Sequence, residues 1–150
     1  MSFYMILVLI HIFAAIVGLG PGFIMTFIVT KASTMTELRH AYFLRNKVHI
    51  FVMLGGVFLF VTGMWMGLMN PNLFFQGWYI LSLILFLMTL AAGPLVLKPL
   101  SAPIKQILAE HKGEEIPSTY DIYAKRLFLC ERILNIIFLI IIFLMIVKPF

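Results

Sequence analysis

The sequence predicts an all-α integral membrane protein, a four-transmembrane-helix bundle, and three observations lead to this fold class. Hydrophobic residues make up 63% of the chain and charged residues 11%, whereas soluble domains carry about 25% charged residues. Residues 3–29 contain no Asp, Glu, Lys or Arg, and about 20 apolar residues cross the hydrocarbon layer. Three further apolar stretches follow. With 150 residues there is room for four spans and little else, so residues 1–150 are expected to form one membrane domain.

Polar or turn-forming residues bound each span. The chain begins without a basic residue, so its first apolar stretch is expected to be an uncleaved span and not a signal peptide. Gly63 and Gly67 form a GxxxG pair in the second span, which favours close helix contact. Pro94 and Pro99 are expected to kink or end the third span. On these grounds the spans are placed at about residues 3–30, 48–69, 78–97 and 124–147.

The long polar segment between spans three and four is expected to contain one short amphipathic helix on the cytoplasmic surface. Ser101 is its expected N-cap, Ile104 and Leu108 lie on its apolar stripe, and Gly113 is expected to end it. The residues from Ser118 resemble a capping box. The fourth helix is therefore expected to begin well before the bilayer.

The distribution of basic residues predicts the orientation of the protein. The segments Lys31 to Lys47 and Lys98 to Arg126, which follow spans one and three, hold nine Lys and Arg, whereas the loop after span two and the two termini hold one, Lys148. The positive-inside rule puts the basic loops in the cytoplasm and both termini outside. Membrane topology thus explains the net charge of +5, and we expect the lipid bilayer, and no nucleic acid, as the partner.

His11 is the candidate functional residue of the first span. It lies roughly 12 Å below the outer boundary at 1.5 Å per residue, and it shares a helix face with Ala15, Gly18 and Gly22. A face of small residues is where a neighbouring helix approaches, so His11 should point into the bundle. Two interpretations stay open. His11 either donates or accepts an interhelical hydrogen bond, or it is an axial ligand of haem, with the small residues admitting the flat macrocycle.

Other polar and sulfur-bearing side chains in the spans are candidates for supporting roles. Arg132 and Asn135 follow Glu131 in span four, where they are either a structural lock to the rest of the bundle or a cationic site for a propionate or another anion. Met64 is one of three methionines near the outer end of span two. Thioethers are soft ligands for Cu(I) or haem iron, and the alternative interpretation is apolar packing.

Four stretches of the chain carry a resemblance to a known family. They are LIHIFAAIVGLGPGF in span one, LRHAYFLRNKVHIFVMLGGVFLFVTGMWMG across span two, GWYILSLILFLM in span three, and ERILNIIFLIIIFLMIVKPF at the end. With these motifs the chain resembles the four-helix bacterial membrane proteins grouped around the HemJ-type protoporphyrinogen oxidases and the CopD-like copper-resistance proteins. The resemblance covers nearly the whole chain. It implies a multi-pass protein of the bacterial cytoplasmic membrane.

The resemblance to the HemJ-type enzymes also implies a cofactor. Their first-span histidine and a span-three lysine are associated with haem b and with oxidation of protoporphyrinogen, so the resemblance implies that His11 is a haem ligand and that a porphyrin is a partner. The lysine position is Ser82 here, which implies a lost or altered oxidase activity. The second axial ligand would be Met64, the His11 of a second copy in a homodimer, or absent. The competing interpretation is a non-enzymatic membrane subunit or scaffold, or a CopD-like protein that handles copper.

Overall fold

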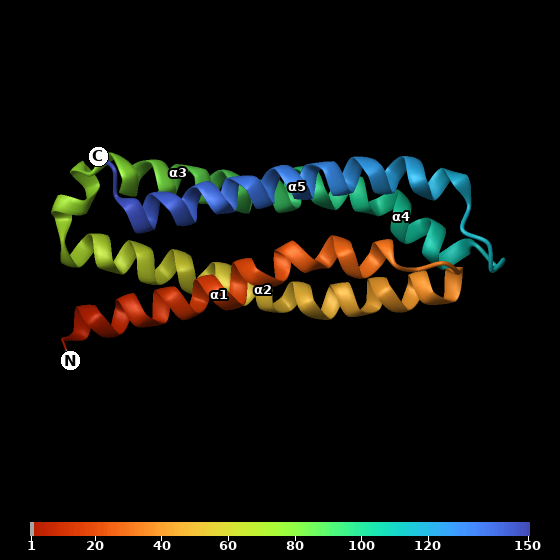
Figure 1. The fold of residues 1–150 in the computed structure, drawn as a ribbon, viewed down its shortest axis with the longest axis horizontal. Coiled ribbons are helices and arrows are strands. Elements are labelled where there is room, and N and C mark those ends of the chain that lie inside the picture. Colours follow the sequence, from red (N-terminus) through yellow and green to blue (C-terminus); the bar gives the residue numbers. More distant parts are fainter. Residues whose placement is uncertain (1) are drawn as a thin grey trace.

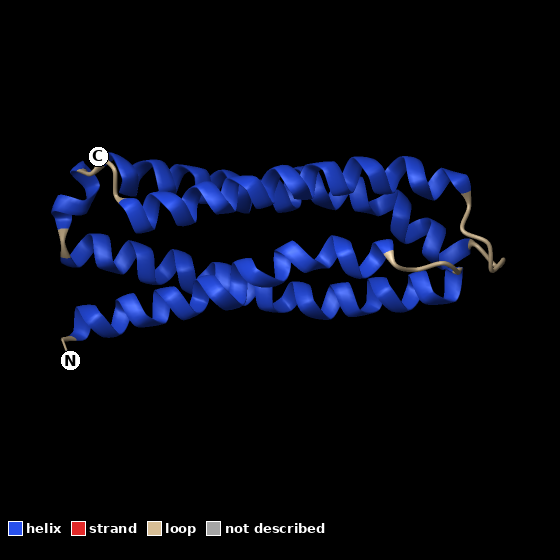
Figure 2. Cartoon of the chain, viewed as in Figure 1, coloured by secondary structure: helices blue, strands red, loops and turns tan. Residues whose placement is uncertain are grey.

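The computed structural model describes residues 2–150, and every regular element within that range is helical. Four long helices dominate the fold (Figures 1 and 2). Two short segments, a 3₁₀ helix (η1) and a π-helical stretch (η2), lie within the connections. In chain order the elements are α1 (Phe3–Thr30), α2 (Met35–Met69), η1 (Pro71–Phe75), α3 (Gly77–Ala92), η2 (Gly93–Leu97), α4 (Lys98–Glu110) and α5 (Ser118–Val147).

The long helices form two antiparallel pairs, α1 with α2 and α3 with α5 (Figure 1). Gly18 of α1 lies directly against Gly55 of α2, where a Cβ atom added to Gly18 would come within 2.9 Å of the Gly55 backbone. Small residues allow such a close approach, which favours helix association inside a membrane. The first pair is therefore tightly packed near its middle.

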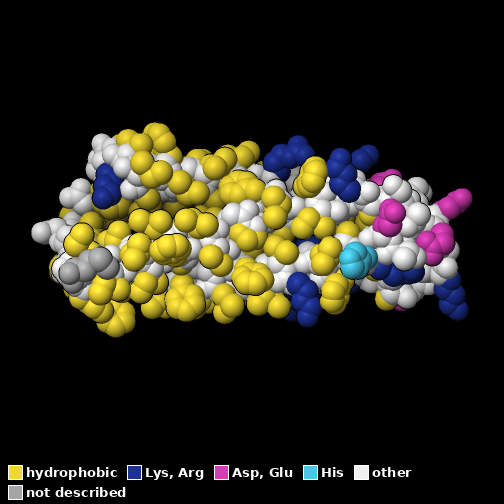
Figure 3. Space-filling view, turned by 60° about the horizontal axis from the view of Figure 1, so that its bottom comes forward, with side chains coloured by type: hydrophobic (Ala, Val, Ile, Leu, Met, Phe, Trp, Pro, Cys, Tyr) yellow, Lys and Arg dark blue, Asp and Glu magenta, His cyan; other side chains and the backbone are white. Residues whose placement is uncertain are grey.

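Four helical stretches are long and apolar enough to cross a membrane: Phe3–Thr30, Met35–Met69, Gly77–Glu110 and Ser118–Val147. This confirms the predicted four-helix membrane fold. Both termini lie at the same end of the bundle, called here the terminal end, and the connections after α1 and α4 lie at the opposite, loop end (Figure 1). Hydrophobic side chains cover the surface toward the terminal end, whereas charged side chains gather toward the loop end (Figure 3). Which end faces the cytoplasm stays a prediction.

The second helix begins 13 residues before the predicted span, at Met35 and not at 48. Thr34 caps its N-terminus by accepting a hydrogen bond from the Glu37 backbone N–H at 3.2 Å, and the Glu37 carboxylate accepts one from the Ser33 N–H at 2.7 Å. Because Lys and Arg are frequent in this stretch, the sequence analysis placed it in a loop. It forms instead the polar start of α2.

The predicted amphipathic helix exists as α4, but its predicted ends were wrong. Ser101 is not its cap: the helix continues from η2 without a break, and the Ser101 hydroxyl donates to the Lys98 carbonyl. Pro94 lies at the start of the π-helical segment, whose wider turn accommodates a proline that lacks an N–H donor. The far end of α4 is at Glu110, before Gly113.

The fourth long helix begins at Ser118, so the predicted early start is confirmed. The predicted capping box is wrong, since Pro117 occupies the N-cap position and no side chain caps the helix. A proline with extended backbone geometry stops the preceding loop from continuing as helix. The start of the helix therefore depends on proline and not on a serine cap.

The apolar core is concentrated at the loop end, where α1, α2, α4 and α5 meet. Next to this core, the buried Arg45 of α2 forms an ion pair with Glu131 of α5, and the Thr26 hydroxyl of α1 donates to the same carboxylate at 2.8 Å. These contacts join the two helix pairs near the middle of the bundle. The largest core cluster comprises Val29, Met35, Leu38, Ala41, Tyr42, Ile104, Tyr120, Ala124 and Leu127.

Candidate functional site

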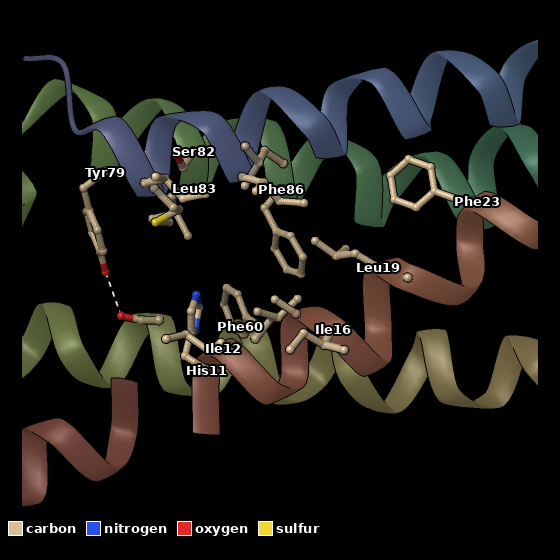
Figure 4. Close-up of a pocket in the computed structure, with 18 residues that line it drawn as sticks. His11, Ile12, Ile16, Leu19, Phe23, Phe60, Tyr79, Ser82, Leu83 and Phe86 are labelled. Atoms are coloured by element: carbon tan, nitrogen blue, oxygen red, sulfur yellow. Dashed lines mark hydrogen bonds between the residues drawn. The ribbon is translucent and has the colours of Figure 1, made fainter. Parts of the chain in front are cut away.

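Between the two helix pairs, toward the terminal end, lies a cavity of about 490 Å³. This volume falls within the range of roughly 300–1,000 Å³ found for ligand and cofactor sites. Every long helix contributes to its wall, and most of the lining side chains are apolar (Figure 4). The lining comprises His11, Ile12, Ala15, Ile16, Leu19, Gly20, Phe23, Leu59, Phe60, Gly63, Tyr79, Ser82, Leu83, Phe86, Ile141, Ile142, Met145 and Ile146.

His11 reaches from α1 toward this cavity, with its ring directed at the layer formed by α3 and α5 (Figure 4). Its Nδ1 atom lies 2.8 Å from the Thr62 hydroxyl oxygen of α2. The same hydroxyl lies 2.6 Å from the Phe58 carbonyl oxygen and donates its proton there. With its own proton directed to Phe58, the hydroxyl accepts from His11, which assigns the imidazole proton to Nδ1.

The hydrogen bond to Thr62 leaves the other ring nitrogen, Nε2, with a free lone pair. The hydrogen bonds found within residues 2–150 include none to Nε2 of His11. Histidines that bind metals commonly have this arrangement, in which a hydrogen bond from one nitrogen fixes the tautomer and orients the other toward the metal. His11 can act as a ligand or as a hydrogen-bond acceptor, but in this tautomer Nε2 cannot donate.

The opposite wall, formed by α3 and α5, holds the other polar and sulfur-bearing side chains of the cavity. Tyr79 donates from its hydroxyl to the Gly63 carbonyl of α2 at 2.9 Å, a contact that connects the two pairs at the terminal end (Figure 4). The Ser82 hydroxyl is fully buried and has no hydrogen-bond partner within residues 2–150. Met145 of α5 is the one methionine of the lining.

The wall of the cavity includes residues of the lipid-facing surface. Three of its lining residues are strongly exposed on the outer surface: Ile12 and Ile16 of α1, at 52% and 63%, and Ile146 of α5, at 75%. All three belong to helices long and apolar enough to span the membrane.

Three of the predicted site residues, His11, Ala15 and Ser82, line the cavity. Gly18 and Gly22 share a face with His11 in sequence but do not line it. Gly18 is covered by α2, and the Gly22 carbonyl accepts a hydrogen bond from the Asn135 side chain at 3.3 Å. Gly22 lies eleven residues beyond His11, roughly 16 Å along the helix. The small-residue face therefore serves helix packing below the cavity.

Arg132 and Asn135 lie nearer the middle of the bundle than the cavity does. Arg132 is exposed, and it is Glu131, its neighbour, that connects α5 to the other pair through Arg45 and Thr26. The structural lock considered from the sequence is thus formed by Glu131 and Asn135. Arg132 directly follows Glu131, which contacts Thr26 of α1. Thr26 lies roughly 22 Å from His11 along that helix.

Met64 lies on a different face of α2 from the cavity. It lines a shallow surface groove together with Trp65 and Met69, so its sulfur is not part of the His11 site. Within residues 2–150 no group of three or more His, Cys, Asp and Glu side chains could hold a metal ion. A metal at His11 would therefore need ligands of another kind, such as the thioether of Met145 or the nitrogens of a macrocycle.

Four residues that contact His11, line the cavity or join the helix pairs were not predicted from the sequence: Thr62, Tyr79, Met145 and Arg45. For Arg45 a signal was present, since Leu38, Ala41, Tyr42 and Arg45 recur at helical spacing. The other three residues gave no comparable signal. Thr62, Tyr79 and Met145 lie in apolar stretches in which only the packing of neighbouring helices decides the inward face.

Comparison with known proteins yields one family. The family model described as "Predicted integral membrane protein (DUF2269)" matches residues 5–149 of the chain. Neither a curated protein nor a solved structure gives a significant match.

Proposed function

The chain belongs to this family of predicted integral membrane proteins, and on that premise we propose that it is a haem b-associated redox protein whose cavity holds the haem on His11. The proposed location is the bacterial cytoplasmic membrane, with both termini outside. The resemblance to the HemJ-type proteins suggests the cofactor, and the cavity makes it chemically reasonable.

The observation that carries this proposal is the state of the His11 ring. Thr62 accepts a hydrogen bond from Nδ1 and donates one to the Phe58 carbonyl, so the imidazole is assigned as neutral, with its proton on Nδ1 and a lone pair on Nε2. Neutral imidazole is the form that binds haem iron. An interhelical hydrogen bond and a ligand role are therefore compatible here, because the two nitrogens serve different partners.

The remaining lining is consistent with a tetrapyrrole. Its volume of about 490 Å³ and its mostly apolar walls suit a flat, largely hydrophobic group. Met145 lies on α5, across the cavity from the helix that carries His11, and His with Met is a known axial ligand pair that raises the haem potential. This supports Met145, in place of Met64 or the His11 of a second copy, as a second ligand. When bound, the haem would supply one-electron chemistry.

The position that is lysine in the HemJ-type enzymes also belongs to the cavity wall, as Ser82. A serine hydroxyl carries no charge and is a far weaker acid–base group than an amine near neutral pH. We therefore propose a haem-linked redox function that differs from the protoporphyrinogen oxidase activity of those enzymes. A porphyrin stays the proposed ligand class.

The test is a visible spectrum of the detergent-purified protein from cells given a haem precursor. We expect a Soret band that is lost in His11→Ala and kept in His49→Ala, a matched control because His49 is exposed on α2. Met145→Leu should keep the haem but change its spin state. A colourless wild-type protein at normal yield would overturn the proposal. Copper in the same sample would favour the CopD-like alternative, for which Met64 and Met69 share one surface groove.

A further inference from the structure

A bound haem would bring two propionate carboxylates into this part of the molecule, and the structure offers few groups to receive them. From the sequence, Arg132 was a candidate for this role. Arg132 lies near the mid-bundle ion pair, however, and far from the cavity level. In the terminal half of the bundle, Lys148, directly after α5, is the only Asp, Glu, Lys or Arg of the described chain.

Lys148 directly follows the helix that forms one wall of the cavity. Met145 and Ile146 line the cavity, and Lys148 comes two residues later, roughly 3 Å further along the axis at helical rise. Its side chain lies over the Trp78 ring, with Nζ 5.3 Å from the ring centroid. Trp78 in turn packs edge to face on Tyr79, a lining residue, with 5.9 Å between the ring centroids. Lys148 therefore lies against the residue that precedes the lining Tyr79, close to the terminal end of the cavity wall.

Backbone hydrogen bonds hold the chain around Lys148 in place. Lys148 has a left-handed conformation, with φ of 49°, and its N–H donates to the Leu144 carbonyl at 2.9 Å. Two residues later the Phe150 carbonyl accepts a hydrogen bond from the Trp78 N–H at 3.0 Å. A non-glycine residue rarely adopts positive φ without support from its surroundings. The turn thus fixes the backbone of Lys148 at the terminal end of α3 and α5.

We propose that Lys148 binds the propionate carboxylates of the haem in this cavity, so that the porphyrin lies between an imidazole inside the bundle and an ammonium at its terminal end. This inference rests on the proposed haem function. It assigns the anion-binding role to a residue at the end of the chain, and Arg132 has no part in it. Carboxylate groups would then face the membrane surface, where water reduces the cost of their charge.

The test compares haem with haem dimethyl ester, which has the same ring and iron but uncharged side chains. Haem affinity would be measured by Soret titration of apoprotein in detergent for the wild type, Lys148→Gln, Lys148→Arg and the control Arg132→Gln. For haem we expect Lys148→Gln to weaken binding about two- to fivefold, the range for a partly exposed ion pair. Lys148→Arg should restore binding and Arg132→Gln should leave it unchanged. For the dimethyl ester all four proteins should bind alike.

The outcomes separate the two proposals. If the wild type binds neither compound, the haem function fails and this inference fails with it. If haem binds but Lys148→Gln has no effect, or weakens both compounds equally, the haem function stands and the role of Lys148 is refuted. The difference between Lys148→Gln and wild type should also decrease as salt is raised, because screening weakens exposed ion pairs.

Discussion

Removing the charge of Glu131 should strongly destabilise the bundle. Glu131 and Arg45 are only 7% and 9% exposed, and the carboxylate binds the Arg45 guanidinium through both oxygens. It also accepts from the Thr26 hydroxyl at 2.8 Å. Replacing Glu131 with Leu would leave a buried guanidinium without a counter-ion, which costs about 3–5 kcal/mol.

The contributions of the Arg45 ion pair and the Thr26 hydrogen bond to stability can be measured separately with different substitutions of Glu131. The Thr26 hydrogen bond alone should contribute about 0.6 kcal/mol, and at most roughly 1.7 kcal/mol, the values for such bonds inside membranes. Glu131→Gln keeps an acceptor for Thr26 but removes the charge, so it should retain most of the cost of Glu131→Leu. The double variant Arg45→Met with Glu131→Leu replaces the pair by apolar side chains. It should cost much less than either single change.

The assay is the free energy of unfolding in mixed micelles, from titration with a denaturing detergent and tryptophan fluorescence. Arg132→Met is the matched control, because Arg132 is the next residue in the chain but is exposed, and it should lie within about 0.5 kcal/mol of wild type. The reasoning is refuted if Glu131→Leu costs no more than Arg132→Met. It is also refuted if the costs of the two single changes add in the double variant, since that would mean that the two residues do not interact.

Three further predictions concern packing, the site and topology. Gly18→Leu should prevent close packing of α1 on α2 and lower the unfolding free energy by at least about 2 kcal/mol, whereas Gly20→Leu, with open space around it, should be nearly neutral in the same titration. Thr62→Val removes the acceptor of the site histidine and should weaken haem binding about 10- to 100-fold by Soret titration; unchanged affinity would contradict the tautomer argument. In intact cells, an impermeant thiol reagent should label Ser2→Cys but not Gly113→Cys, and the reverse pattern would invert the topology.

The sequence determined the helices and their number. A run such as residues 3–29 without a charged side chain must satisfy its backbone hydrogen bonds internally in lipid, and a helix does so within one segment. The apolar lengths therefore fixed four spans with little ambiguity. The polar ends of the helices were harder to place, because Arg45 and its neighbours carry the composition of a loop but pack as the first turns of α2.

Which side chains meet was decided by the tertiary structure. In an almost uniformly apolar helix, hydrophobicity does not distinguish the face toward lipid from the face toward protein. The inward face depends on close contacts such as that of Gly18 with Gly55, and these contacts place Met145 in the cavity and Met64 outside it. The sequence could indicate His11, since an imidazole is rare at that depth. Only the folded bundle supplied Thr62, which sets the tautomer of the ring.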